Sequence, residues 1–272
     1  MSDSPPPTAS TVAAGALRLA CEERGRGDAL VLVAGGAMDM DQWAAQIDAF
    51  APAHRVIRFD QRGVGHSDGP PTGYTIQQMA TDTLALITTL NAAPCVLFGT
   101  SLGGSVALEA ALQSPTSLRG LVLAATSAGP TGPQMAPDTQ TAMFRASALP
   151  LQEAAEAAQD FVFASDYPRR HPDVLQRAIA KRESNTGPLI ATLGPLQSLA
   201  AYHPLPRLAT LTVPTLILHG AEDRMVPSGN ADLLAQHIPH ATLTLVPNAG
   251  HGLVMESADT VNAAVRDFID SL

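Results

Sequence analysis

Short runs of apolar residues alternate along the chain with longer stretches in which apolar residues recur every three or four positions. The short runs are continuous rather than alternating, which is typical of strands that are buried on both faces of a parallel sheet. A segment of alternating apolar and polar residues, Ala16–Glu22, instead fits an antiparallel edge strand. The runs predicted as buried strands are Leu30–Val33, Val56–Phe59, Val96–Phe98, Leu121–Ala124, Thr215–Leu218 and Leu243–Val246.

The longer stretches have the spacing of amphipathic helices, with one apolar stripe that a sheet can bury. Their alternation with the predicted strands indicates an α/β fold with a mostly parallel central sheet and helices on both of its faces. The helices expected to cover the sheet are Met40–Phe50, Ile76–Leu90, Ser105–Gln113, Ala231–His237 and Ser257–Ile269.

The alternation stops between the predicted strands Leu121–Ala124 and Thr215–Leu218, where no convincing strand occurs. We interpret residues 131–207 as a helical cap inserted before the last two strands, and residues 1–130 and 208–272 as the core. Residues 1–12 are rich in Ser, Pro and Thr and are expected to be a disordered tail. The helical patterns in the cap are Thr139–Ser147, Leu151–Phe163, Asp173–Glu183 and Leu189–Ala200.

Composition narrows the possible partners of this chain of 272 residues. Its formal net charge of -9 opposes binding to nucleic acid and to anionic membranes. No apolar stretch is long enough for a membrane span, and the N-terminus lacks an export pattern, so we expect a cytoplasmic protein. Two cysteines, Cys21 and Cys95, without nearby ligand residues indicate neither a disulfide framework nor a metal site. The pattern does not indicate an oligomeric state.

The clearest chemical motif is Gly99-Thr100-Ser101-Leu102-Gly103, which follows a predicted strand and precedes a helical stretch. In a G-x-S-x-G turn the serine adopts a strained conformation that exposes its hydroxyl, and small flanking residues let strand and helix approach. Because a helix begins just after Ser101, its free N–H groups face developing negative charge, and the Leu102 N–H is a candidate oxyanion donor. The bare pattern is weak evidence, but its position between strand and helix predicts a nucleophilic serine.

With four further segments this motif makes the sequence similar to the α/β-hydrolase family over Leu30 to Leu272. The resemblance implies the α/β-hydrolase fold and the order nucleophile, acid, histidine along the chain. Ala34-Gly35-Gly36 resembles the oxyanion loop of the family, the segment from Phe59 to Asp68 its D-x-R-G-x-G-x-S motif, the segment from His219 to Asp223 its acid loop, and the segment from Asn248 to His251 its histidine loop.

A serine hydroxyl needs a base to accept its proton, and a carboxylate to orient that base. His251 is the candidate base because it follows the last predicted strand in a loop bracketed by glycines. The family pattern makes Asp223 the acid, with Glu222 as the neighbouring alternative. His219 and His66 are interpreted as structural. Asp60 is also interpreted as structural, holding Arg62 and the turn that follows.

The oxyanion hole requires a second N–H group besides that of Leu102. The resemblance assigns this role to Gly36, with Ala37 as the alternative. Where the family more often has His-Gly, this chain has Ala34-Gly35, a variation similar to some methylesterases that act on polyketides.

These features predict a carboxylic ester hydrolase that works without a cofactor or metal, through an acyl-enzyme, on a small and largely apolar ester. Enol-lactonase and carbon–carbon hydrolase activity remain alternatives, because the segments Arg58 to Asp68 and Gly99 to Leu112 resemble 3-oxoadipate enol-lactonases and one triad serves many substrates. Thioesterases and perhydrolases share the motifs. A homologue that only binds a small-molecule ester or lactone is the alternative from another class.

Four apolar residues are candidate substrate contacts: Met38 and Trp43 near the oxyanion loop, and Phe144 and Phe161 in the predicted cap. Apolar side chains of this kind can form an acyl or alcohol pocket. Packing between cap helices is the alternative interpretation for each of them.

Overall fold

The computed structural model describes residues 10–36, 38–164, 167–173 and 189–272. Its centre is an eight-stranded sheet with the order β1-β2-β4-β3-β5-β6-β7-β8. Strands β3 to β8 are parallel, whereas β2 is antiparallel to both β1 and β4. The strands are β1 Ser10–Ala14, β2 Leu17–Arg24, β3 Ala29–Val33, β4 Arg55–Phe59, β5 Cys95–Thr100, β6 Leu118–Ala124, β7 Thr215–Gly220 and β8 Ala241–Val246.

The predicted sheet is confirmed, including the antiparallel strand near its edge, but the edge strand itself was missed. Residues 10–12 were assigned to a disordered tail and instead belong to β1. A tight turn at Gly15, whose φ is +63°, lets β1 pair with β2 over its whole length. Pairing through the backbone does not need an apolar sequence, so the polar and exposed residues at the start of β1 gave no strand signal. Residues 1–9 of the predicted tail lie outside the described residues.

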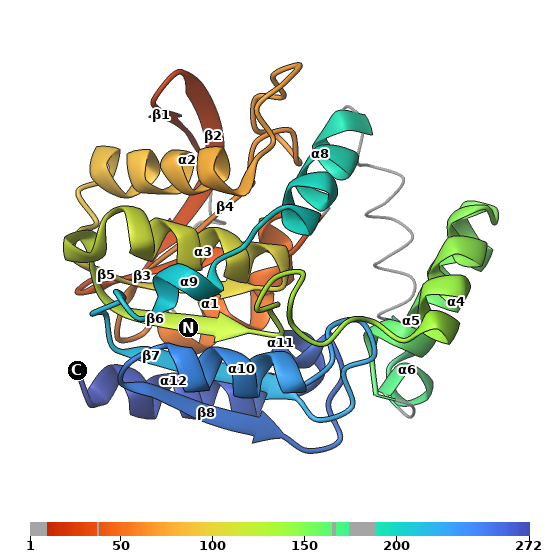
Figure 1. The fold of residues 1–272 in the computed structure, drawn as a ribbon. Coiled ribbons are helices and arrows are strands. Elements are labelled where there is room, and N and C mark those ends of the chain that lie inside the picture. The colour runs from red at the N-terminus through yellow and green to blue at the C-terminus, as the bar shows by residue number, and fades with distance from the viewer. Residues whose placement is uncertain (1–9, 37, 165–166, 174–188) are drawn as a thin grey trace, which may run out of the picture.

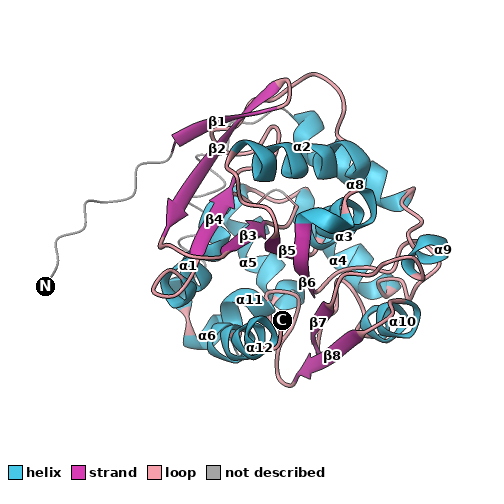
Figure 2. Cartoon of the chain, turned by 90° about the vertical axis from the view of Figure 1, so that its left-hand side faces the viewer, coloured by secondary structure: helices cyan, strands magenta, loops and turns pink. Residues whose placement is uncertain are grey.

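Helices cover both faces of the sheet (Figure 1 and Figure 2). One face packs against α2 Ile76–Thr89, α3 Leu102–Gln113 and α10 Gly229–His237, and its core includes Leu86, Val106 and Leu234. The other face packs against α1 Ala44–Phe50 and α12 Ala258–Asp270, with Ile47 and Val261 in its core. Three shorter helices lie beside the longer ones: η1 Met40–Trp43 before α1, η2 Pro115–Ser117 after α3 and α11 Leu253–Glu256 before α12.

The segment between β6 and β7, which contains the predicted cap, is helical wherever it forms regular structure within the described residues. In Figure 1, α4, α5, α6 and α8 lie beyond the carboxyl ends of the parallel strands. The predicted helix Asp173–Glu183 lies outside the described residues except for its first residue. None of the helices in the described ranges combines the length and the apolar character that crossing a bilayer requires. The helices of this segment are α4 Pro137–Ser147, α5 Leu151–Val162, α6 Tyr167–Arg170, α8 Leu189–Ala200 and α9 Leu205–Leu208.

Candidate active site

Ser101 occupies the sharp turn between β5 and α3, with a φ of 54° and a ψ of -123°. Such a conformation is strained for a residue with a side chain. The glycines on either side are required by close backbone contacts. A Cβ on Gly99 would lie 2.2 Å from the Gly103 carbonyl oxygen, and a Cβ on Gly103 would lie 2.2 Å from the Val33 carbonyl oxygen. The G-x-S-x-G spacing is therefore a steric requirement of this turn.

The strained turn is held by hydrogen bonds to the adjacent strand β6 and the loop after it. The Ser101 N–H donates to the Ala124 carbonyl oxygen at 2.8 Å. The Thr126 hydroxyl donates to the Ser101 carbonyl oxygen at 2.7 Å, and it also lies 3.2 Å from the Ser105 hydroxyl in α3. The backbone of Ser101 is therefore held by the end of β6 and the loop that follows it.

The structure brings the three predicted catalytic residues together at the carboxyl ends of β5, β7 and β8. His251 Nε2 lies 2.9 Å from Ser101 Oγ, and His251 Nδ1 lies 2.8 Å from Asp223 Oδ2. A carboxylate can only accept, so Nδ1 donates and Nε2 is left to accept the serine proton. Asp223 is buried whereas the neighbouring Glu222 is exposed, so it is Asp223 that contacts the imidazole.

The Asp223 carboxylate is held in its ionised form by several donors. Its Oδ1 atom accepts the N–H groups of Met225 at 2.9 Å and Val226 at 2.8 Å. Burial alone would raise the pKa of Asp223, but the charge and hydrogen bonds of His251 and His219 outweigh burial and lower the pKa to about 2. A permanently charged carboxylate suits a residue that must orient and stabilise an imidazolium.

His219, at the end of β7, has a contact that the sequence did not indicate. Its Nε2 atom lies 2.8 Å from the Val226 carbonyl oxygen and 3.3 Å from Asp223 Oδ2. A carbonyl oxygen can only accept, so Nε2 carries the hydrogen and the Asp223 carboxylate lies between two imidazoles. The ring is fully buried. The expectation of a structural role is therefore compatible with a direct contact to the acid.

The oxyanion loop after β3 lies against the nucleophile turn. A Cβ on Gly35 would be 3.5 Å from Ser101 Cβ, and a Cβ on Gly36 would be 3.6 Å from Leu102 Cδ2. The Gly35 N–H is already used, because it donates to Gln42 Oε1 at 2.8 Å. Within the described part of the chain, the N–H groups of Gly36 and Leu102 have no acceptor. They are the two donors that the sequence predicted; the alternative donor, Ala37, lies outside the described residues.

The histidine loop is packed against the cap segment that follows α5. A Cβ on Gly252 would lie 2.4 Å from Phe163 Cε1, so this contact leaves no space for a side chain. The Glu256 carboxylate accepts the Gly250 N–H at 2.6 Å and the Ala164 N–H at 2.9 Å, and so joins the loop to the cap. Burial raises the pKa of this carboxyl group. No sequence motif that we considered pointed to Glu256.

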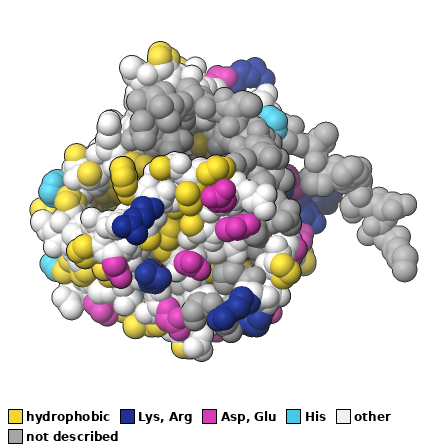
Figure 3. Space-filling view, turned by 90° about the vertical axis from the view of Figure 1, so that its right-hand side faces the viewer, with side chains coloured by type: hydrophobic (Ala, Val, Ile, Leu, Met, Phe, Trp, Pro, Cys, Tyr) yellow, Lys and Arg dark blue, Asp and Glu magenta, His cyan; other side chains and the backbone are white. Residues whose placement is uncertain are grey.

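The four predicted substrate contacts are not gathered around one cavity. Trp43 has no exposed surface and packs edge-on against Phe98, with ring centroids 4.7 Å apart, so it is a core residue in this structure. Phe161 is also buried, and Met38 packs against the same core cluster as Trp43. Phe144 is 78% exposed on α4. Figure 3 shows hydrophobic side chains among charges of both signs on the side that carries α4 to α6. Trp43 thus packs against β5 in the core of the sheet and not between cap helices.

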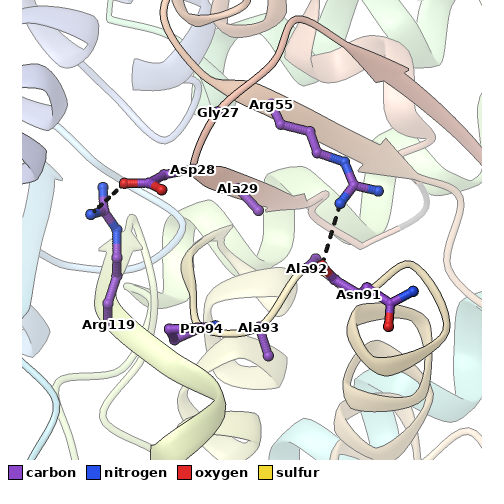
Figure 4. Close-up of a pocket in the computed structure, with 9 residues that line it drawn as sticks. All are labelled: Gly27, Asp28, Ala29, Arg55, Asn91, Ala92, Ala93, Pro94 and Arg119. Atoms are coloured by element: carbon purple, nitrogen blue, oxygen red, sulfur yellow. Dashed lines mark hydrogen bonds and ion pairs between the residues drawn. The ribbon is translucent and has the colours of Figure 1, made fainter.

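The walls of two cavities among the described residues contain none of those four candidates. The larger, of about 350 Å³, lies at the amino ends of β3 to β6 and therefore at the edge of the sheet opposite Ser101. Figure 4 shows Arg119 of this cavity paired with Asp28 at 2.9 Å, and Arg55 directed toward the backbone of Asn91. The smaller, of about 290 Å³, has a mainly apolar wall and lies between α8 and the loops after β6 and β7.

In the loop after β4, the expectation that Asp60 holds Arg62 is wrong. Arg62 does not pair with Asp60; its guanidinium binds both carboxylate oxygens of Asp82, at 2.6 and 2.7 Å. Asp60 instead accepts the N–H groups of Met40 and His66 and so connects its own loop to the segment after β3. Asp82 is in α2, and nothing in the local motif indicated this pairing.

Comparisons with known proteins identify the family. The model of the α/β hydrolase fold family matches residues 28–258, so the chain belongs to this family. The protein named carbamate hydrolase RutD in Stutzerimonas stutzeri is 28% identical over 234 residues. The matched region covers 84% of this chain and 86% of RutD.

Solved structures agree with this assignment. A thermophilic esterase from Thermogutta terrifontis is 27% identical, with a TM-score of 0.82 over 97% of this chain and 98% of the esterase. The enol-lactonase from Burkholderia xenovorans is 26% identical, with a TM-score of 0.81 over 96% of this chain and all of the enol-lactonase. The names of these relatives support a hydrolase.

Proposed function

We propose that this chain is a serine hydrolase that cleaves a small, largely apolar carboxylic ester through an acyl-enzyme. The observation that carries the proposal is the continuous chain of contacts from Ser101 Oγ through His251 to Asp223, at 2.9 and 2.8 Å. Both distances are within the reach that a nucleophile, its base and an orienting acid need.

In the first step Ser101 Oγ attacks the ester carbonyl carbon while its proton moves to His251 Nε2. A bond forms between Oγ and the carbonyl carbon, and the carbonyl oxygen becomes an oxyanion. The N–H groups of Gly36 and Leu102 have no other partner in the described chain and are the proposed donors to this oxygen. These hydrogen bonds accelerate the reaction because they stabilise the negative charge that develops on the carbonyl oxygen in the transition state.

The oxyanion then collapses, the bond to the leaving alkoxide breaks, and His251 returns its proton to that oxygen. Water attacks the acyl-enzyme in the second step, with His251 again accepting the proton, and the acid leaves as Ser101 is regenerated. Asp223 stays charged throughout, in agreement with its pKa of about 2, and stabilises the imidazolium.

The smaller cavity supports a small, apolar substrate. Its wall includes Leu196 and Leu199 of α8 together with Met225, whose N–H donates to the acid Asp223. Burial of an apolar acyl or alcohol group there would favour binding by the hydrophobic effect.

Hydrolysis of a lactone is a second candidate, and the similarity to the Burkholderia enol-lactonase favours it. The same steps apply, except that the alcohol oxygen stays attached to the acyl chain when the ring opens. Parallel assays of short esters and of lactones of the same acid separate the two candidates through their kcat/KM values.

The substitution Ser101→Ala tests the mechanism. We expect the purified variant to fold and to lose at least about a thousandfold in kcat, because the nucleophile is absent. A fluorophosphonate should label the unaltered protein at Ser101 and leave the variant unlabelled, as measured by mass spectrometry. A folded variant with unchanged activity would contradict the proposal, and a folded native protein that neither hydrolyses esters nor is labelled would favour a binding protein.

A further inference from the structure

Gln42 lies beside the nucleophile, and its amide orientation is determined by a hydrogen bond. The side chain accepts the Gly35 N–H at 2.8 Å. Only the amide oxygen can accept from an N–H group, so Oε1 faces Gly35 and the Nε2 amino group is directed elsewhere. Gln42 therefore has a donor group of known identity next to the oxyanion loop.

The Nε2 hydrogens of Gln42 have no acceptor among the described residues. The described hydrogen bonds of this residue involve its backbone N–H, which donates to the Asp39 carbonyl oxygen, and its Oε1 atom. The side chain is half-buried, and Nε2 is not among the described polar atoms that are sealed from solvent without a partner. A donor of this kind is free to bind a ligand oxygen at little desolvation cost.

The absence of a side chain at Gly35 leaves a space between Gln42 and Ser101. The point that a Cβ of residue 35 would occupy is 3.5 Å from Ser101 Cβ and 3.7 Å from Gln42 Nε2. Ser101 and the Gln42 amide therefore flank the same side of Gly35, and a substrate atom packed against this side would lie next to both. The space is thus formed by three residues that the chain brings together after β3 and β5.

The sheet order indicates which part of a substrate would enter this space. Gln42 follows β3, on one side of β5, whereas His251 follows β8, on the other side. A leaving group must be near His251 to receive its proton, and the oxyanion must be near the N–H groups of Gly36 and Leu102. The remaining substituent of the carbonyl carbon is the acyl chain, which is directed toward Gln42.

We propose that Gln42 Nε2 donates a hydrogen bond to a second oxygen of the substrate, located in the acyl chain close to the scissile carbonyl. This inference rests on the proposed function and defines its substrate class: acyl compounds with an acceptor oxygen adjacent to the cleaved bond, such as alkoxy or keto acyl esters. The alternative is a purely structural role, in which Gln42 only holds the oxyanion loop through Oε1.

The test compares two esters of the same size and leaving group, 4-nitrophenyl methoxyacetate and 4-nitrophenyl butanoate. They differ in one position of the acyl chain, which is an ether oxygen in the first and a methylene in the second. After division by the alkaline hydrolysis rates, the native protein should prefer the methoxyacetate about five- to tenfold in kcat/KM, the effect of one hydrogen bond. No preference in the native protein would overturn the proposal without any variant.

Two variants separate the roles of the amide. Gln42→Glu keeps an acceptor for the Gly35 N–H and removes the donor, whereas Gln42→Met removes both at similar volume. The proposal expects the preference for methoxyacetate to disappear in both variants. If Gln42 only holds the loop, each variant changes the two kcat/KM values by the same factor and the preference persists in both; this result overturns the proposal.

The design distinguishes failure of this inference from failure of the proposed function. A folded native protein that hydrolyses neither ester contradicts serine ester hydrolysis itself. If both esters are hydrolysed but the methoxyacetate is not preferred after division by the alkaline hydrolysis rates, only the assignment of Gln42 is contradicted. An equal fall for both esters in both variants leaves the preference unchanged and therefore also overturns the assignment of Gln42 to the acyl chain.

Discussion

The nucleophile turn and the histidine loop face each other across 2.9 Å, yet different parts of the protein hold them. Ser101 is held by β6, by the loop after β6 and by close backbone packing against the end of β3. The loop of His251 is joined to the cap, because the Gly252 N–H donates to the Val162 carbonyl oxygen at 2.8 Å and Glu256 bridges Gly250 and Ala164.

This difference has a consequence for how the site responds to change. The core of the sheet positions the nucleophile independently of the cap, because the strands and helices around Ser101 are closely packed and leave little room for another arrangement. The base is held by Asp223, but its loop also has polar contacts to an inserted segment, and such contacts are more easily altered. Changes in the cap should therefore reach the chemistry through His251 rather than through Ser101.

The largest effect is expected from Gly99→Ala on the core side. The new Cβ would lie 2.2 Å from the Gly103 carbonyl oxygen, and a backbone atom cannot move aside without shifting α3. We expect a loss of about 3 kcal/mol or more in the free energy of unfolding, measured by urea denaturation, together with loss of fluorophosphonate labelling.

Gly120→Ala is the matched control for this prediction. Its Cβ would also meet atoms at short distance, the nearest being Leu272 Cδ1 at 2.7 Å, but these are the ends of side chains that can rotate away. A milder loss of stability and unchanged labelling are expected. Equal effects of the two substitutions would show that the backbone contact at Gly99 is not special.

A smaller effect is expected at Asp223, the acid that contacts His251. The pKa of Asp223 is lowered from 3.8 to about 2, so its charge stabilises the folded state above the ordinary pKa and this contribution is lost as the pH falls through about 2. The contribution is about 2 kcal/mol at pH 6, with roughly half of it remaining at pH 3.

Urea denaturation of the native protein and of Asp223→Asn at pH 6 and pH 3 measures this contribution. The difference between the two proteins should shrink by about 1 kcal/mol on acidification. A difference that stays constant or grows at pH 3 would contradict the lowered pKa of Asp223.

The smallest effect is expected for Glu256→Gln on the cap side. The Gly250 and Ala164 N–H groups bind different oxygens of Glu256, and in a glutamine one of these oxygens is replaced by an NH2 group that cannot accept, so one contact is lost. We expect kcat/KM to fall about tenfold through misplacement of His251, with little change in thermal stability. Glu153→Gln, which removes the same charge from an exposed position on α5, should leave kcat/KM unchanged. A Glu256 variant as active as this control would exclude the coupling.

Local sequence was sufficient wherever the physical cause is local. The strand and helix periodicities follow from burial on the faces of one sheet, and they predicted the sheet and the helices that cover it. Gly99 is required by a contact with Gly103 four residues further on, so this part of the motif has a local cause, whereas Gly103 is required by Val33 of the neighbouring strand β3. The loops of Asp223 and His251 were found because each follows a strand end and has a motif of its own.

Tertiary structure decided what depends on contacts between distant segments. Trp43 belongs to the core because Phe98 packs against it, and Arg62 pairs with Asp82 twenty positions away. The contact of Glu256 with Ala164 and the space beside Gln42 require segments that meet only after folding. A sequence pattern records which side chains prefer burial or a turn, whereas the partner of a polar group is determined by the three-dimensional packing of the whole chain.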